Sequence, residues 1–429
     1  MQVKRLISRF IDIIFIFTAF VLTNLTAFSV TVRFPDLSDS YVYACVAMIA
    51  SLLALLFVQI DLLALWSDFK NIWKKQLPLI IFIVFCIASL LWSVYFNASL
   101  FQLSLMIFAS LIGVYLAIRY KPGTVFEIVR YFGVFSVVTS FLLFILVPPL
   151  ARLDNPVFQG AWRGIFWHRN HLGSLMAFFS AIFLVKAMIT SHLRVQLFIN
   201  AVFFILSALL VFGSRSATGI LIFLFLSGML FFVFLWLRIR HVLKKKHYII
   251  LLIILGIIAI ILITNLDFFF GLLGRNTSLT GRIPLWNDLI KNIWTQRPIL
   301  GYGFGALWKQ ESFRIFMQMK LGWTYPVYFS DNGYLDLLLN IGVVGLCSFV
   351  MFFLITGVRS FKAFVKNPNP ISLFPLLIFV YVLVANISYS FLVEIDQFVW
   401  MLLVIAATLS IRMVGIDKIP NNKTNNPQP

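Results

Sequence analysis

Long apolar runs separated by short polar segments make up most of this chain. A bilayer core of about 30 Å is crossed by roughly 20 helical residues. Runs of this length predict twelve transmembrane helices, at 10–31, 41–60, 77–96, 99–118, 126–147, 171–190, 196–213, 218–237, 248–266, 333–357, 371–390 and 395–413. The first run is too long for the apolar core of a signal peptide, so we expect it to remain as a helix. The pattern predicts an all-α integral membrane protein.

Composition supports this prediction. Of the 429 residues, 61% are hydrophobic and 11% charged, against roughly 45–50% and 25% in soluble domains. A soluble, coiled-coil, collagenous or disordered chain is therefore excluded. We expect residues 1–419 to form one polytopic membrane domain, and the Asn- and Pro-rich residues 420–429 to form a disordered cytoplasmic tail. The three cysteines, Cys45, Cys86 and Cys347, lie in apolar runs and show neither metal-ligand nor disulfide spacing.

The net charge of +19 is unevenly distributed between the predicted loops. Loops on one side carry most lysines and arginines, whereas short loops on the other side carry only Arg33 and Arg215. The positive-inside rule places both termini in the cytoplasm, which agrees with an even number of helices. In a membrane protein this explanation of the positive charge replaces nucleic-acid binding, and no nucleic-acid partner is expected.

Two long loops on the outer face, at about 148–170 and 267–332, depart from the rule. They contain the arginines Arg152, Arg163, Arg169, Arg275, Arg282, Arg297 and Arg314. Arginine presents a planar fork of donors that matches phosphate oxygens. The alternative is that long loops cross the membrane regardless of charge. The whole set favours a site for phosphate groups.

Residues 162–173 form the first polar motif, at the mouth of the sixth predicted helix. Arg169 and the free N–H groups of a helix start could together hold an anion, with Arg163 nearby. One alternative is an aromatic and basic belt at the membrane interface. Another is a metal site on His168 and His171, although no carboxylate or third histidine is near in sequence. Asn170 lies between these histidines.

Arg215 lies in a short outer turn, Gly213-Ser214-Arg215-Ser216-Ala217. A charge facing lipid there costs on the order of 3 kcal/mol, so such a residue usually faces a polar cavity. The alternative is an arginine that extends to the headgroups.

The second long loop contains two further patterns. Leu285, Leu289 and Ile293 recur at helical spacing opposite polar residues, which predicts an amphipathic surface helix. The sequence Gly301-Tyr302-Gly303-Phe304-Gly305 follows, and its glycines permit tight turns and close backbone approach. On its own this glycine pattern does not identify a ligand.

Acidic residues provide candidate bases. Asp331 and Asn332 precede the tenth predicted helix, and Asp336 lies about a turn and a half deeper. Asp331 could be a helix cap, or a general base or positioning group. Other outer-loop acids are better explained as solvated side chains than as metal ligands; these are Asp36, Asp39, Glu394 and Asp396. No metal or cofactor is predicted.

Five motifs in order resemble the O-antigen ligase and polymerase superfamily. They are GIFWHRNHLG (164–173), GSRSA (213–217), TGRIPLW (280–286), RPILGYGFGALW (297–308) and DNGYLDLLLNIGVVG (331–345). The two motifs at 280–286 and 297–308 resemble the exopolysaccharide polymerase branch more than the lipopolysaccharide ligases. The resemblance implies a metal-independent inverting glycosyltransferase of the bacterial inner membrane. Its donor would be a glycan on undecaprenyl diphosphate at the outer leaflet, and its acceptor a glycan or lipid-linked glycan.

The resemblance also implies roles for individual residues. Arg215 and Arg282 would bind the diphosphate, with Arg163 and Arg169 as weaker candidates, and negative charge growing on the leaving group would be stabilised there. The family usually has His-Asn where this chain has Asp331-Asn332, so Asp331 is the expected base. Supporting roles fall to His168, Asn170, His171 and Asn332.

Three alternatives stay open. A ligase that attaches glycan to a lipid A core is less favoured than a polymerase of exopolysaccharide or O-antigen units. A transporter of lipid-linked sugars would also need a basic cavity, but it predicts internal repeats and charges within the membrane helices. A scaffold protein would not need the arginines. The sugars, the acceptor, the linkage and the oligomeric state are not determined by the sequence.

Overall fold

The computed structural model describes residues 72–153, 158–166, 168–239, 282–323, 327–392 and 397–415. Three predicted helices, at 10–31, 41–60 and 248–266, lie outside these residues. So do the predicted tail and seven side chains considered above: Arg33, Asp36, Asp39, Cys45, Arg275, Glu394 and Asp396.

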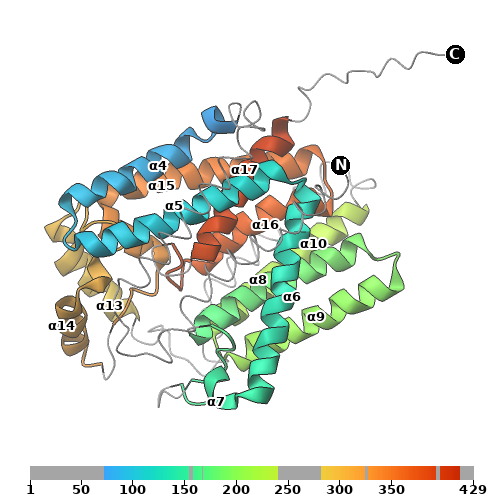
Figure 1. Ribbon diagram of the computed structural model, residues 1–429, viewed down its shortest axis with the longest axis horizontal. Helices are drawn as coiled ribbons and strands as arrows, with labels where there is room; N and C mark the ends of the chain where they lie inside the picture. Colours follow the sequence, from blue (N-terminus) through green and yellow to red (C-terminus); the bar gives the residue numbers. More distant parts are fainter. Residues whose placement is uncertain are drawn as a thin grey trace, which may run out of the picture.

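The described residues are helical, with an isolated bridge between Arg152 and Trp162 and no longer β-strand. Nine of the predicted apolar runs fall in this part of the chain, and each forms a helix (Figure 1). Seven of these helices are long and apolar enough to cross a bilayer: α5 (Phe96–Arg119), α6 (Pro122–Leu146), α8 (Arg169–Ile189), α9 (Arg194–Gly213), α10 (Ala217–Ile239), α15 (Gly333–Lys366) and α17 (Gln397–Gly415).

The described residues also contain two shorter apolar helices of the bundle. They are α4 (Leu77–Ala88), which continues as a 3₁₀ turn at Ser89–Trp92, and α16 (Pro370–Ala385). Among the described residues, three α-helices lie between the apolar runs: α7 (Pro148–Ala151), α13 (Arg282–Asp288) and α14 (Glu311–Leu321). Within α13 and the turn after it, Leu285, Leu289 and Ile293 are buried, which confirms the predicted amphipathic pattern.

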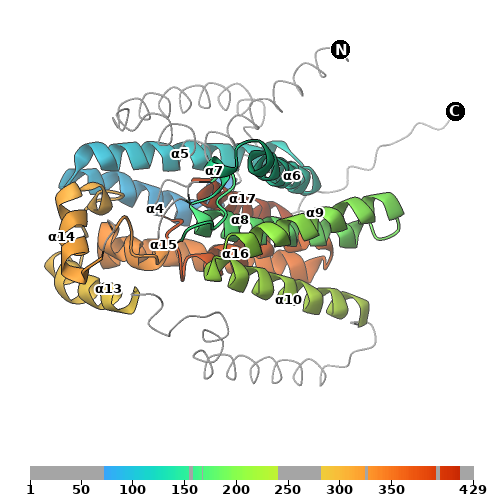
Figure 2. The same ribbon diagram turned by 90° about the horizontal axis from the view of Figure 1, so that it is seen from below.

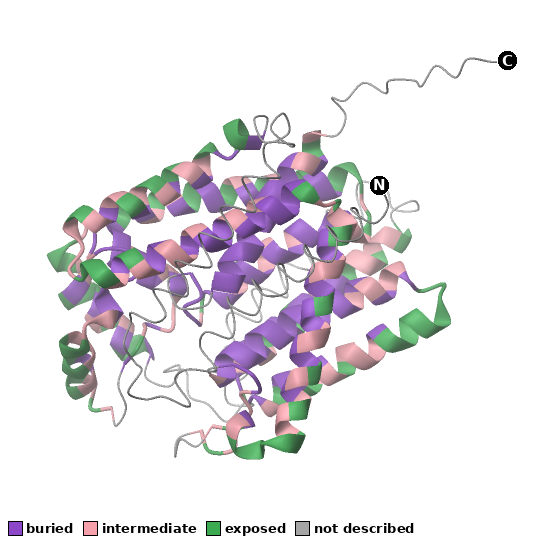
Figure 3. Ribbon diagram, viewed as in Figure 1, coloured by how far each residue is buried: buried purple, intermediate pink, exposed green. Residues whose placement is uncertain are grey.

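The core lies along α8, α16 and α17, whose residues are mostly buried (Figure 3). α8 packs against both α9 and α10, and α17 packs along α5. At Gly219 of α10, an added Cβ would lie 2.6 Å from the carbonyl carbon of Gly173 in α8. Close approach of this kind is common between membrane helices, because small residues let the two backbones meet. The outer faces of α9 and α10 expose large apolar side chains, including Phe198, Leu209 and Phe225, as expected of a lipid-facing surface.

Basic residues gather at one end of the bundle, which we call the basic end and define by Lys186, Arg359, Lys366 and Arg412. Arg412 donates to the carbonyl groups of Ala117 and Tyr120, and Lys366 to that of Val414. These contacts join the carboxyl ends of α5, α15 and α17. Helices α13 and α14 lie at the opposite end, the site end (Figure 2). The predicted orientation of the two ends across the membrane stays a prediction.

The backbone of α15 is broken at Gly342, whose φ of 64° and ψ of −171° are not helical. Residues 297–305 enter this break. The amide of Val343 donates to Pro298 O at 2.9 Å, and the amide of Gly303 donates to Asn340 O at 2.8 Å. Backbone groups that the break removes from the helix therefore find partners in the loop, as a membrane protein requires.

The glycines of this loop make the insertion possible. Gly301, Gly303 and Gly305 all have positive φ. A Cβ on Gly303 would lie 2.5 Å from Ser93 Oγ. The predicted use of these glycines, for tight turns and close backbone approach, is confirmed.

Candidate functional site

The start of α8 forms the first part of the site. His168 is its N-cap, and His168 Nδ1 accepts a hydrogen bond from the amide of Asn170 at 3.3 Å. Arg169 is only 4% exposed, and its guanidinium carbon lies 4.0 Å from the centre of the Phe158 ring. It also donates to the backbone carbonyl of Arg215. The folded chain therefore joins two of the sequence motifs, which are 46 residues apart.

The turn between α9 and α10 forms the second part. Ser216 Oγ donates to Asn170 Oδ1 at 2.9 Å, and both side chains are buried. Arg215 has a φ of +50°, which is unusual for a residue with a Cβ. Its side chain is exposed and reaches the carbonyl of Gln159 at 3.4 Å. Arg169 and Arg215 thus contact the neighbouring residues Phe158 and Gln159.

Helix α13 and the mouth of α15 form the third part. Arg282, at the start of α13, makes an ion pair with Asp331 in which Nε lies 2.9 Å from Oδ2. One helical turn later, Trp286 Nε1 donates to the carbonyl of Ser330 at 2.7 Å. Residues four apart lie on one face of a helix, so α13 presents both side chains to adjacent residues of the turn before α15.

Asn332, rather than Asp331, caps α15. Asn332 Oδ1 accepts from the amides of Tyr334 and Leu335, each at 3.1 Å. Asp331 has a φ of +59° and turns its carboxylate toward Arg282. The alternative that Asp331 is only the helix cap is therefore wrong, because the next residue occupies that position.

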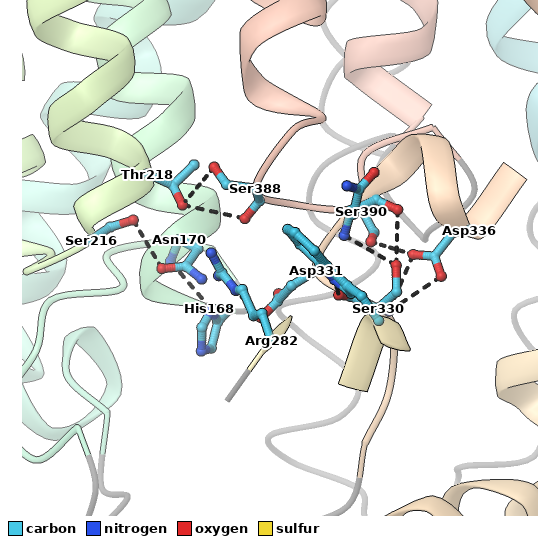
Figure 4. A network of polar contacts seen from close by, with 12 residues as sticks. His168, Asn170, Ser216, Thr218, Arg282, Ser330, Asp331, Asp336, Ser388 and Ser390 are labelled. Carbon is cyan, nitrogen blue, oxygen red and sulfur yellow. Dashed lines mark hydrogen bonds and ion pairs between the residues drawn. The ribbon is translucent and has the colours of Figure 1, made fainter. Parts of the chain in front are cut away.

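The segment 386–392, after α16, connects the three parts (Figure 4). Ser388 Oγ donates to Thr218 Oγ1 on α10 at 3.1 Å. The Tyr389 ring is stacked on that of His168, with centroids 6.4 Å apart. Ser390 Oγ donates to the carboxylate of Asp336 on α15. In the close-up, the side chains of Arg282 and Asp331 lie in the middle. The polar side chains of α8 and α10 lie on one side of them, and those of Ser330 and Asp336 on the other.

The sequence analysis identified no functional motif in this segment. Its polar residues, Asn386 to Ser390, interrupt the apolar run and could have indicated the end of a helix. The predicted helix 371–390 is therefore too long, because α16 ends at Ala385.

His168 is neutral in this environment. Burial, and then the positive charges of Arg169, His171 and Arg282, lower the pKa of His168 to about 3. Because Nδ1 accepts from Asn170, the neutral ring carries its proton on Nε2. His168 is therefore suited to donate a hydrogen bond and poorly suited to act as a base. Arg282 lies next to His168 in the close-up, which places the start of α13 near the start of α8 (Figure 4).

The remaining predicted site residues have different positions. Arg163 Nε donates to the carbonyl of Leu150 at 2.9 Å, and burial lowers the pKa of Arg163. Its guanidinium thus fixes the loop after α6. His171 is buried in α8, with its ring against those of Phe166 and Phe391.

The arrangement combines positive charge with a carboxylate. Arg169, Arg215 and Arg282 come from three segments near the starts of α8, α10 and α13, and helix starts favour anions. Asp331 adds one proton acceptor directly beside Arg282. Such a site can bind an anion and accept a proton next to it. In the described residues no three His, Cys, Asp or Glu side chains are grouped so that they could hold a metal ion.

Comparison with known families agrees with this geometry. Residues 202–350 match the family model described as O-antigen ligase. The match extends from α9 into α15 and includes Arg215, Arg282 and Asp331, whereas His168 and Arg169 precede it. No curated protein matches the chain.

Proposed function

We propose that this chain, a multi-pass membrane member of the O-antigen ligase and polymerase superfamily, is a metal-independent inverting glycosyltransferase. Its donor is a glycan on undecaprenyl diphosphate, at the outer face of the bacterial inner membrane. Its acceptor is a second glycan or a glycan on a lipid. Polymerisation of exopolysaccharide or O-antigen units is favoured over ligation to a lipid A core, because the motifs at 280–286 and 297–308 resemble the polymerase branch.

The ion pair between Arg282 and Asp331 is the observation that carries this proposal. An inverting displacement needs a cation beside the leaving diphosphate and a base beside the acceptor hydroxyl. In this ion pair, Arg282 supplies the cation and Asp331 supplies the base. As the acceptor oxygen bonds to the anomeric carbon, the bond from that carbon to the phosphate oxygen breaks. The electron pair leaves with the diphosphate, and the hydroxyl proton passes to Asp331.

The arginines are expected to act mainly in the transition state. Charge on the diphosphate grows as the glycosidic bond to it breaks, so guanidinium groups already in position stabilise that stage most. Arg282 and Arg215 are the principal ligands in this proposal. Arg169 supports them, since it holds the backbone carbonyl of Arg215. Neutral His168 donates a hydrogen bond from Nε2 to the same anion.

Transfer by the purified protein tests the proposal. The protein is reconstituted in liposomes with an undecaprenyl-diphosphate-linked oligosaccharide, with and without excess EDTA. We expect longer glycans, released undecaprenyl diphosphate and an inverted anomeric configuration in both conditions. Retention of configuration, or activity lost in EDTA and restored by Mg²⁺ or Mn²⁺, would refute the mechanism. Movement of the donor across the bilayer without bond formation would indicate a transporter instead.

A further inference from the structure

Asp336 is a fully buried acid in the first turns of α15, with 0% of its surface exposed. Three separate segments donate hydrogen bonds to its carboxylate. Trp308 Nε1 donates to Oδ1 at 2.7 Å, the amide of Ser330 donates at 3.2 Å, and Ser390 Oγ donates to Oδ2. The indole and the amide can only donate, so they require an acceptor at this position.

The partners of Asp336 come from parts of the chain that surround Asp331. Trp308 follows the glycine loop that enters the break in α15, and Ser390 lies in the segment that contacts α10 and His168. Ser330 directly precedes Asp331. One carboxylate therefore ties the glycine loop, the 386–392 segment and the turn before α15 to a single point.

The amide, the carbonyl and the hydroxyl of Ser330 all form hydrogen bonds. Asp336 accepts from its amide, Trp286 donates to its carbonyl, and its hydroxyl is bonded to the backbone of Asn332. Asp331 follows with a φ of +59°. A residue with a Cβ stays in that conformation only where its surroundings impose it. The contacts of Ser330 impose it here, and the buried end of that set of contacts is Asp336.

We propose that Asp336 is the positioning residue of the site. By holding Ser330, it fixes the backbone of Asp331 and turns that carboxylate toward Arg282 and the acceptor. Asp336 does not touch substrate and acts through Asp331. This inference rests on the proposed function, in which Asp331 is the base.

The competing explanation is that Asp336 only stabilises the fold. A double-mutant cycle separates the two roles, because residues that act through one another give non-additive effects. If Asp336 acts through Asp331, then Asp336→Ala removes little further activity once Asp331→Asn is present. If Asp336 only stabilises the fold, the loss of activity in the doubly substituted protein should equal the product of the two single losses.

The experiment compares turnover of Asp336→Ala, Asp336→Asn, Asp331→Asn and the doubly substituted proteins in the liposome assay. We expect Asp336→Ala to lose about 100-fold in kcat with a smaller change in KM. Asp336→Asn keeps an oxygen for Trp308 and Ser330, so it should stay within about 10-fold of the wild type, because it replaces one acceptor and leaves the others. Glu127→Ala is the matched control, since Glu127 pairs with Arg130 and Lys186 at the basic end; its kcat should be unchanged within twofold.

Amide exchange supplies a readout that does not depend on activity. Peptides covering residues 327–335 should exchange faster in Asp336→Ala than in the wild type, while those of α9 stay unchanged. If Asp336→Ala does not accumulate, Ser390→Ala replaces it in the cycle, with an expected loss of about fivefold for one missing donor. Multiplicative losses, or unchanged exchange at 327–335, would overturn the proposal. Full activity of Asp331→Asn would instead contradict the proposed base, and the exchange result would still decide whether Asp336 holds the turn.

Discussion

Arg282 and Asp331, 49 residues apart in sequence, form an ion pair at the site end of the bundle. Its two side chains are 10% and 27% exposed, so the pair is partly shielded from solvent. Each group neutralises the other before substrate binds. A bound diphosphate would compete with Asp331 for the guanidinium. The proposed leaving-group ligand and the proposed base therefore affect each other directly.

Replacing Arg282 should lower kcat more than it raises KM. Arg282→Lys keeps the charge but loses the planar fork, and Arg282→Ala also leaves the Asp331 carboxylate unpaired. We expect a loss on the order of 100-fold in both variants, as when an oxyanion donor is removed. Steady-state rates with the lipid-linked donor provide the measurement. Arg314→Lys is the control, because Arg314 of α14 packs over the Tyr328 ring; this variant should keep its activity.

Substitutions of Arg215 separate the effect of losing the guanidinium group from the effect of the positive φ at this position. Its φ of +50° suits glycine, so Arg215→Gly should be at least as stable to heat as Arg215→Ala. Both variants should lose about 100-fold in kcat, because both lack the guanidinium. Arg194→Ala, at the other end of α9, is expected to behave as the wild type. Full activity of Arg215→Ala at a normal protein level would refute the role of Arg215.

The environment of His168 predicts how the stability of the protein changes with pH. Its pKa is lowered to about 3 in the folded protein, whereas an unfolded histidine titrates near pH 6.5. The unfolded chain therefore binds a proton that the folded chain does not, and His168 lowers stability progressively as pH falls from 6.5 toward 3. Thermal unfolding in detergent at pH 7 and pH 5 should show a larger decrease for the wild type than for His168→Gln. Equal decreases would mean that His168 is protonated in the folded state.

The glycine loop should be sensitive to a single methyl group. Gly303→Ala places a Cβ 2.5 Å from Ser93 Oγ at a φ of +104°. We expect it to lower the free energy of unfolding by at least about 1 kcal/mol. Gly228→Ala on α10 is the matched control, since a Cβ there meets no atom within 4 Å. A thermal shift that is the same for both variants would contradict the close packing of the glycine loop against Ser93.

The apolar runs predicted the helices well because lipid imposes one length scale on every span. All nine runs in the described residues are helical. The pattern could not predict the break at Gly342, since an apolar run continues through it. Nor could it predict that α15 extends to Lys366, because a helix that leaves the membrane is no longer limited by bilayer thickness.

The site was predicted as a set of residue types rather than as an arrangement. Motifs identified Arg282 and Asp331, but nothing in the sequence indicated that they pair. The N-cap of α15 shows why the arrangement could not be predicted. Asp and Asn are nearly equally good N-caps, so the sequence alone does not decide between Asp331 and Asn332, and only the backbone geometry does. The sequence also indicates Asp336 as an acid near the start of this helix, but its partners Trp308, Ser330 and Ser390 come from three segments that only tertiary packing brings together.

Asp331→Asn tests the central claim most directly. Asparagine adopts positive φ readily and can still accept from Arg282, but it cannot take a proton from the acceptor. The measurement is the initial rate of glycan transfer from the undecaprenyl-diphosphate donor, at equal amounts of folded wild-type and variant protein. The proposed mechanism predicts a rate lower by at least about 100-fold, with donor binding retained. A variant that transfers glycan at the wild-type rate would contradict it.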